Sequence, residues 1–143
     1  MKRIPVDERL SVAAQPSTAE IAALGADGVA LLINNRPDGE EPGQLGSSAE
    51  RKAAEAAGLA YLDLPVTGPT ITEEAVRRFA EAVAAAPGPV VAHCRSGTRS
   101  LTLWAIAAVR SGRLQREEVL AFGAERGIDL AGALRWLDAH PEG

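Results

Sequence analysis

The sequence predicts a single α/β domain over residues 1–143, with a small, mostly parallel central sheet and helices on both faces. Short apolar runs alternate with helical patterns along the chain, as they do in β-α-β units. Residues 29–33 and 89–92 are continuously apolar, as strands buried on both faces are. A chain of 143 residues suits one hydrophobic core, and no stretch has the length and composition of a linker between domains.

Capping and breaking residues set the boundaries near the N-terminus. Residues 2–6 and 10–13 are expected to form short extended segments. Ser17 and Glu20 have the spacing of a helix-capping box, in which each side chain satisfies a backbone N–H of the other residue. A short helix is therefore expected to begin at this box and to end at Gly25.

The middle of the chain contains two expected strands separated by a loop and a helix. The buried strand at residues 29–33 leads into a polar loop over residues 34–43, which is rich in Pro and Gly. A helix is expected over residues 48–57, with Gly58 as its stop signal, and a strand over residues 59–66.

The second half of the chain is predicted to be mostly helical. Thr70 and Glu73 suggest another capping box, at the start of a helix with one apolar stripe. After the strand at residues 89–92, a helix over residues 97–111 is apolar on most of its surface, which predicts a buried, central helix. The remaining expected helices lie at residues 117–125 and 130–139.

The only cysteine, Cys94, falls at the turn between the last expected strand and the central helix. Backbone N–H groups and the positive end of the helix dipole point at a thiol in such a turn, and both stabilise the reactive thiolate. Gly97 lets successive N–H groups turn inward, and Arg99 adds a planar, permanently charged fork. The pattern predicts an anion-binding loop with a nucleophile at its floor. The residues of this loop are Arg95, Ser96, Gly97, Thr98, Arg99 and Ser100.

Several of these residues have a plainer interpretation that stays open. A lone cysteine is usually a small buried hydrophobe, although its Arg, Ser and Gly neighbours disfavour that here. His93 either packs at the strand end or supports the loop and favours the thiolate. Arg95 faces either solvent or the anion, and Ser100 either hydrogen-bonds the sulfur or only begins the helix.

Two aspartates are candidate acids for the same site. The carboxyl ends of parallel strands share one edge of a sheet, so the loop over residues 34–43 should lie near Cys94. This places Arg36, Asp38 and Asp63 near the thiol. Either aspartate could act as a catalytic acid, or could simply be solvated or cap a helix.

Composition excludes several other kinds of protein. A net charge of -4 argues against a general binder of nucleic acid or of anionic membranes. A single cysteine forms no internal disulfide, and neither a signal peptide nor a membrane-spanning run is evident, so a cytoplasmic location is expected. No cofactor is expected, and no metal site either, because His93 and His140 are far apart and Cys94 is alone.

Two chemistries use such a loop, and its spacing favours one of them. Attack on a sulfane sulfur gives a persulfide, which a small thiol then removes, whereas attack on phosphorus gives a phosphocysteine, which water hydrolyses. Four residues separate Cys94 from Arg99, one fewer than in cysteine phosphatases, and residues 67–72 lack the aspartate of dual-specificity phosphatases. The main hypothesis is therefore a sulfurtransferase whose partners are a small sulfur donor and a thiol acceptor. The alternatives are a phosphatase acting on phosphate esters and a non-catalytic module that senses anions or sulfide.

The loop over residues 94–100 resembles the short active-site loop of rhodanese-type sulfurtransferases, but the rest of the chain does not. The segments SVAAQPS, INNRPDGE and YLDLPV and the Cys94 loop, in this order, resemble the phosphatase-like domain of beta-lactamase-hydrolase-like proteins. That resemblance extends from about residue 3 to 111. It implies a tyrosine-phosphatase-like fold with Cys94 as nucleophile and with Arg99 and the backbone of residues 96–98 as anion cradle. It leaves the choice between phosphatase and sulfurtransferase open.

Overall fold

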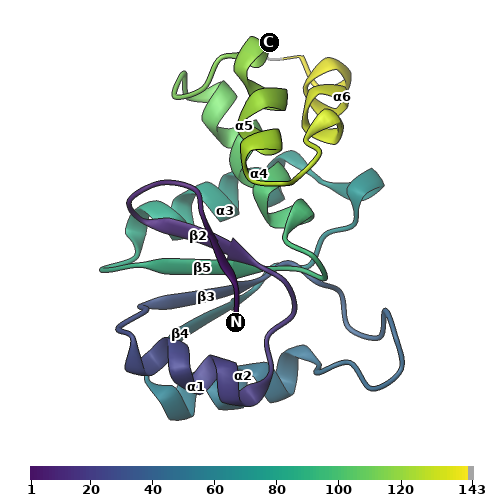
Figure 1. Ribbon diagram of the computed structural model, residues 1–143. Helices are drawn as coiled ribbons and strands as arrows, with labels where there is room; N and C mark the ends of the chain where they lie inside the picture. Colours follow the sequence, from purple (N-terminus) through teal and green to yellow (C-terminus); the bar gives the residue numbers. More distant parts are fainter. Residues whose placement is uncertain (142–143) are drawn as a thin grey trace.

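The computed structural model describes residues 1–141, in which a five-stranded sheet lies between helices (Figure 1). The strands are β1 (Arg3–Pro5), β2 (Leu10–Ala13), β3 (Leu31–Asn34), β4 (Ala60–Asp63) and β5 (Val90–His93). Their order across the sheet is β1-β2-β5-β3-β4, and only β1 is antiparallel to its neighbour. The predicted fold class is therefore confirmed, with β5 and its following loop at the centre of the sheet.

Helices cover both faces of this sheet. On one face lie α1 (Thr18–Ala26) and α2 (Ser47–Ala57), and on the other lie α3 (Glu73–Ala85) and α4 (Thr98–Arg110) (Figure 1). The short helices α5 (Val119–Glu125) and α6 (Ala131–Ala139) form a further layer, in which α6 packs against α4. Two short 3₁₀ turns, η1 (Gly68–Thr70) and η2 (Arg116–Glu118), complete the chain order.

The side chains of β5 alternate between the two faces of the sheet and so contact two different apolar clusters. Val90 and Ala92 are buried in the larger core, which includes α3 and α4, whereas Val91 is buried in the smaller cluster on the α1–α2 side. Because side chains alternate along a strand, His93 continues the Val91 side. Its ring meets Glu50 of α2 there, so α2 and the strand end are linked directly beneath the Cys94 loop.

Most element boundaries agree with expectation, and two differ for identifiable reasons. The box of Ser17 and Glu20 caps α1, and Gly58 ends α2 with a positive φ of 84°. The predicted capping box at Thr70 is wrong, because η1 occupies residues 68–70 and Thr72 caps α3 by accepting the Ala75 N–H at 3.0 Å.

The strand expected over residues 59–66 is also shorter than predicted. Its end at Asp63 reflects Pro65, which has no N–H for a continuing ladder. Leu64 and Val66 on either side still donate to the backbone of Asn34 and Asn35, at 2.8 and 3.0 Å. The segment after β4 is thereby held beside the carboxyl end of β3.

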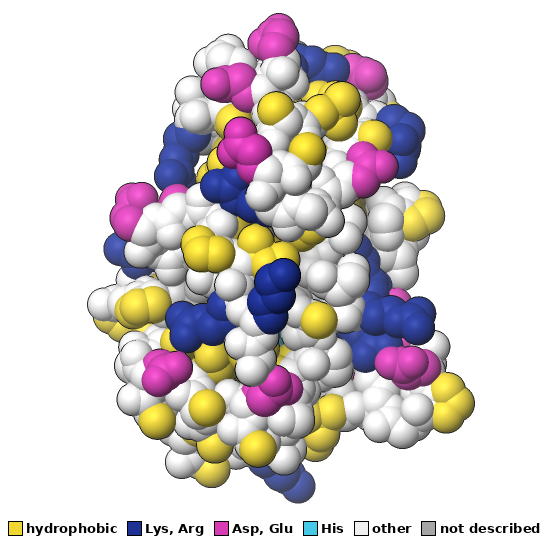
Figure 2. All heavy atoms as spheres, in the orientation of Figure 1, with side chains coloured by type: hydrophobic (Ala, Val, Ile, Leu, Met, Phe, Trp, Pro, Cys, Tyr) yellow, Lys and Arg dark blue, Asp and Glu magenta, His cyan; other side chains and the backbone are white. Residues whose placement is uncertain are grey.

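The surface carries charges of both signs. Figure 2 shows acidic and basic side chains interspersed over one face, with apolar side chains scattered among them. Within residues 1–141, every helix is too short or too polar to traverse a lipid bilayer.

Candidate functional site

Cys94 lies at the floor of a tight loop between β5 and α4. Its side chain is 1% exposed, and its Sγ accepts a hydrogen bond from the Gly97 N–H at 3.0 Å. Gly97 has a φ of 99°, which residues with a Cβ rarely adopt, and a Cβ there would also contact the backbone of Ala13. The glycine therefore lets the loop turn inward and direct its own N–H at the sulfur.

Arg99, at the second position of α4, is held by groups distant in the sequence. Its Nη1 and Nη2 donate to the two carboxylate oxygens of Glu40 at 2.7 and 2.8 Å, and Nη1 also donates to the Val66 carbonyl at 3.0 Å. The hydrogen bonds to Glu40 raise the pKa of Arg99, and the neighbouring Cys94 side chain raises it further. The guanidinium is thus fixed close to the sulfur, with its charge maintained.

A second arginine, Arg36, is buried in the same network. Its guanidinium donates to Glu40 at 3.0 Å, to Glu41 at 2.8 Å and to the side-chain oxygen of Gln15 at 3.1 Å. Burial acts to lower the pKa of Arg36, but Glu41 and Glu40 outweigh it, so the pKa is raised. Glu40 therefore bridges Arg36 and Arg99 and connects the loop after β3 to the Cys94 loop.

The Glu40 bridge predicts a pH-dependent contribution to stability. Hydrogen bonds from Arg99 and Arg36 lower the pKa of Glu40 from 4.5 to about 2. A lowered pKa in the folded state means that the stabilisation is full above pH 4.5 and is lost as the pH falls towards 2. We expect Glu40→Gln to lower the melting temperature at pH 6, and the difference from the wild type to shrink as the pH falls from 4.5 towards 2. Thermal denaturation monitored by circular dichroism measures this.

The matched control is Glu81→Gln, which removes an exposed carboxylate 3.3 Å from Arg77 on α3. Exposed pairs of this kind contribute little, so its melting temperature should follow the wild type at every pH. A Glu40→Gln deficit that stays constant between pH 6 and pH 2 would contradict the assignment of the effect to ionised Glu40.

Beneath the loop, Glu50 accepts three hydrogen bonds in a completely buried position. Its donors are the His93 Nε2 at 2.7 Å, the Gln15 Nε2 at 2.8 Å and the Tyr61 hydroxyl at 3.2 Å. The other His93 ring nitrogen, Nδ1, lies 3.2 Å from the carbonyl oxygen of Cys94. His93 therefore contacts the loop backbone and is itself oriented by α2, a geometry that fits both interpretations of His93 made from the sequence.

The remaining loop side chains are divided between solvent and structure. Arg95 is 64% exposed and lies 3.7 Å from Glu41. The Ser100 hydroxyl donates to Asn35 at 2.8 Å, so its proton is directed away from the sulfur. The Ser96 and Thr98 hydroxyls lie 3.3 Å apart at the rim of the loop.

The two candidate acids have different surroundings. Asp38 accepts hydrogen bonds from the Ser47 N–H at 2.8 Å and the Ser47 hydroxyl at 2.9 Å, and so stabilises the first turn of α2. Asp63 ends β4, where it pairs in register with Asn34, which pairs in turn with His93. Burial, and then the charge of Asp38, raise the pKa of Asp63 above its ordinary value.

Glu40, Glu50 and Gln15 were not identified from the sequence. Glu50 lies among the alanines and charged residues of a predicted helix, and nothing local distinguishes it from the solvated Glu55. For Glu40 the sequence offered a weak indication. Glu40 and Glu41 form an acidic pair in a loop expected to lie near Arg36 and Arg99, and could balance the charge of these arginines. Within residues 1–141, no cluster of three His, Cys, Asp or Glu side chains could hold a metal ion.

The chain matches known proteins over nearly its whole length. Residues 3–111 match the model of the family described as beta-lactamase hydrolase-like protein, phosphatase-like domain. The chain is 49% identical over 138 residues to a beta-lactamase hydrolase-like protein of Agrobacterium fabrum and 47% identical over 137 residues to one of Xylella fastidiosa. Each match covers 96% of this chain but only 32% of the relative, so the chain spans about a third of the length of these proteins.

Solved structures share the fold. A Neisseria meningitidis protein described as a "putative phosphatase" is 29% identical, with a TM-score of 0.83 and coverage of 95% of this chain and 96% of that one. PTPMT1, at 21% identity, has a TM-score of 0.75 over 96% of this chain and 92% of its own, which shows the shared fold.

These matches overturn the sequence-based preference for sulfur transfer. The spacing between Cys94 and Arg99 was insufficient evidence. Arg99 is held in place by Glu40 from a distant loop, so its position does not depend on the length of the Cys94 loop alone. The family and the neisserial protein point to phosphatase chemistry instead. The chain belongs to the beta-lactamase hydrolase-like protein, phosphatase-like domain family.

Proposed function

We propose that this chain hydrolyses small phosphate monoesters through a phosphocysteine on Cys94. The observation that carries the proposal is the placement of the Gly97 N–H, 3.0 Å from the sulfur, together with an Arg99 guanidinium fixed beside it. Hydrogen-bond donors and a fixed cation stabilise both an ionised sulfur and the equatorial oxygens of a transferring phosphoryl group. The phosphatase-like family and the phosphatase fold support the same chemistry.

In the first step, the Cys94 thiolate attacks phosphorus. The sulfur–phosphorus bond forms as the bond from phosphorus to the ester oxygen breaks, and the leaving oxygen takes the electron pair. An acid protonates that oxygen, which is required most when the leaving group is a poor one. The Gly97 N–H and Arg99 remain as donors to the phosphoryl oxygens.

In the second step, water attacks the phosphocysteine. The oxygen–phosphorus bond forms, the sulfur–phosphorus bond breaks, and the sulfur leaves as a thiolate. The base that accepts the water proton is the conjugate base of the acid used in the first step, so one carboxyl group can serve both steps. Inorganic phosphate leaves, and the loop returns to its starting state.

Asp63 is the better candidate for this acid. Asp63 lies at the carboxyl end of β4, in register with Asn34, which is in register with His93 next to Cys94. Burial and the charge of Asp38 raise the pKa of Asp63, which favours the protonated form, whereas Asp38 is engaged by Ser47 at the start of α2. We expect Asp63→Asn to lower kcat for phenyl phosphate by about 10²-fold, and to lower it much less for 4-nitrophenyl phosphate, whose leaving group needs little protonation. Steady-state kinetics from pH 4 to 9 should also show the loss of the basic limb in this variant.

Asp38→Asn is the matched control, because the asparagine oxygen can still accept the hydrogen bond from the Ser47 N–H. It should retain the phenyl-phosphate rate at the optimum and keep a basic limb, which moves to lower pH because the charge of Asp38 no longer raises the pKa of Asp63. Equal losses on the two substrates in Asp63→Asn would contradict the acid role while leaving the nucleophile untouched.

The proposed function itself is tested on the wild-type protein. The protein is mixed with 4-nitrophenyl phosphate, released phosphate is measured, and an acid-quenched sample is analysed by intact mass and peptide mapping. We expect turnover and one phosphoryl group attached to Cys94. Absence of both phosphate release and adduct, under conditions where a phosphate analogue binds, would overturn the proposal.

A further inference from the structure

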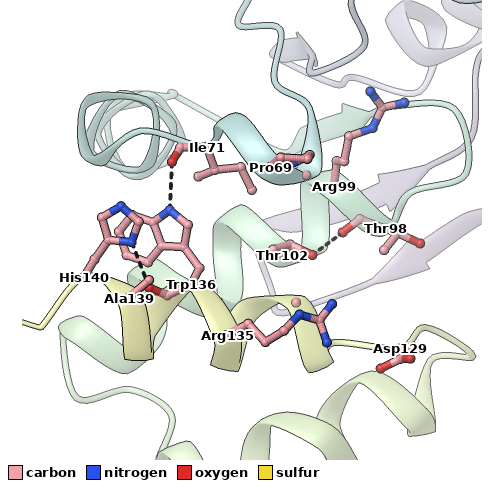
Figure 3. A pocket seen from close by; sticks show the side chains of 12 residues that line it. Pro69, Ile71, Thr98, Arg99, Thr102, Asp129, Arg135, Trp136, Ala139 and His140 are labelled. Carbon is pink, nitrogen blue, oxygen red and sulfur yellow. Dashed lines mark hydrogen bonds between the residues drawn. The ribbon is translucent and has the colours of Figure 1, made fainter.

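A cavity opens directly beside the Arg99 end of the site. Its volume is about 530 Å³, within the range of about 300–1,000 Å³ typical of small-molecule sites. It lies between η1, the first turns of α4 and the helix α6, with Thr98 and the stem of Arg99 along one side (Figure 3). The cavity therefore borders two residues of the Cys94 loop, Thr98 and Arg99.

The middle of the cavity is apolar, and its walls are tied together. Pro69 and Ile71 from the η1 segment line it on one side, and Trp136 from α6 lines it on the other. The Trp136 indole N–H donates to the Ile71 carbonyl at 2.8 Å, and Arg110 lies over the indole ring at 4.7 Å. The cavity is therefore preformed, with apolar surface suited to the body of a small organic group.

The side chain of Arg135 places a positive charge at the end of the cavity opposite Arg99. Figure 3 shows Arg135 projecting from α6 below Thr102, whereas the Arg99 guanidinium projects from α4 at the other side of the cavity. Within residues 1–141, Arg135 forms no ion pair, unlike Arg36 and Arg99, which are each matched by carboxylates. Its charge is available to a ligand.

One carboxylate, that of Asp129, lies at the same end of the cavity as Arg135 and would repel a bound anion. Asp129 lines the cavity, and its Oδ1 accepts the Ala131 N–H at 2.9 Å at the start of α6. It is not paired with Arg135. The two side chains should therefore act on a bound anion with opposite signs, which makes their effects separable by substitution.

We infer that this cavity holds the leaving group of the phosphate ester, and that Arg135 binds a second anionic group on it. This inference rests on the phosphatase function proposed above. The substrate class it specifies is a phosphate monoester with a small apolar body that carries a carboxylate or a second phosphate. Recognition at both ends selects such compounds over phosphate esters whose leaving group has the same size but no charge.

The test compares 4-phosphonooxybenzoate with its neutral counterpart, 4-phosphonooxybenzamide. The ratio of their kcat/KM values isolates the second charge, because the reacting phosphate is the same in both compounds. We expect Arg135→Gln to lower the benzoate-to-benzamide ratio about tenfold, as loss of one charge-assisted hydrogen bond does. Asp129→Asn, which keeps the acceptor for the Ala131 N–H, should raise the ratio. Arg77→Gln, at an exposed arginine of α3 that does not line the cavity, is the matched control and should leave the ratio unchanged.

A second measurement separates this inference from the proposed function. Binding of the non-hydrolysable 4-(phosphonomethyl)benzoate and its carboxamide is measured by calorimetry with the wild type and each variant. Arg135-dependent preference for the benzoate without any turnover would reject the phosphatase function but support the cavity assignment. Turnover with benzoate-to-benzamide and binding ratios that Arg135→Gln leaves unchanged would overturn the cavity assignment alone. Neither binding nor turnover would overturn both.

Discussion

Replacing Cys94 by serine is expected to lower kcat/KM for 4-nitrophenyl phosphate by about 10³-fold or more, as removal of a catalytic nucleophile typically does. The hydroxyl is nearly the size of the thiol and can still accept the Gly97 N–H. A serine hydroxyl is, however, a much weaker nucleophile than the thiolate of the proposed mechanism, so it does not attack phosphorus at a comparable rate. Release of nitrophenolate, followed by absorbance at pH 7, measures the change.

Two accompanying measurements separate lost chemistry from lost structure. Cys94→Ser should bind inorganic phosphate with an affinity comparable to that of the wild type and should melt within a few degrees of it, because Cys94 is small and its cradle is unchanged. Ser111→Ala, at the far end of α4, serves as a matched small substitution and should retain full turnover. Turnover that survives in Cys94→Ser would assign the nucleophile to another group.

The arrangement of elements was predictable because it follows from local pattern. Continuous apolar runs mark β3 and β5 as strands buried on both faces, and alternation with helices implies the parallel sheet. The boundary errors arise where local signals compete. Thr70 and Thr72 are both plausible caps for α3. Thr70 belongs to the 3₁₀ turn η1, which the sequence does not mark strongly, so Thr72 caps the helix.

The centre of the site was also predictable, because Cys94, Gly97 and Arg99 lie within one loop whose chemistry is local. The groups that orient this centre were not, since Glu40 and Glu50 reach it from other elements and depend on tertiary packing. The loop spacing misled for the same reason. Counting residues between a cysteine and an arginine ignores the distant carboxylate that positions the arginine.

The buried Glu50 is the group on which the structure beneath the loop depends. One carboxylate accepts hydrogen bonds from His93, Gln15 and Tyr61, and it does so from a helix that also packs against the sheet through apolar side chains. Such a group is costly to remove, because the fully buried His93 ring would lose its partner and have no water to replace it. The effect of removing Glu50 should therefore exceed that of removing any exposed charge on the chain.

We expect Glu50→Leu to lower the free energy of unfolding by about 3–5 kcal/mol, the usual cost of breaking a buried charged network. Leucine fits the volume approximately but removes the acceptor of three hydrogen bonds, including the one from the buried ring nitrogen of His93. Glu50→Gln keeps one acceptor oxygen and should cost less, about 1–3 kcal/mol. Urea denaturation at pH 7 measures both, with Glu55→Gln on the exposed side of α2 as the control, expected within about 0.5 kcal/mol of the wild type. If Glu50→Leu proved as stable as that control, the hydrogen bonds of Glu50 would not be what joins α2 to the Cys94 loop, and the support of the loop would rest on apolar packing alone.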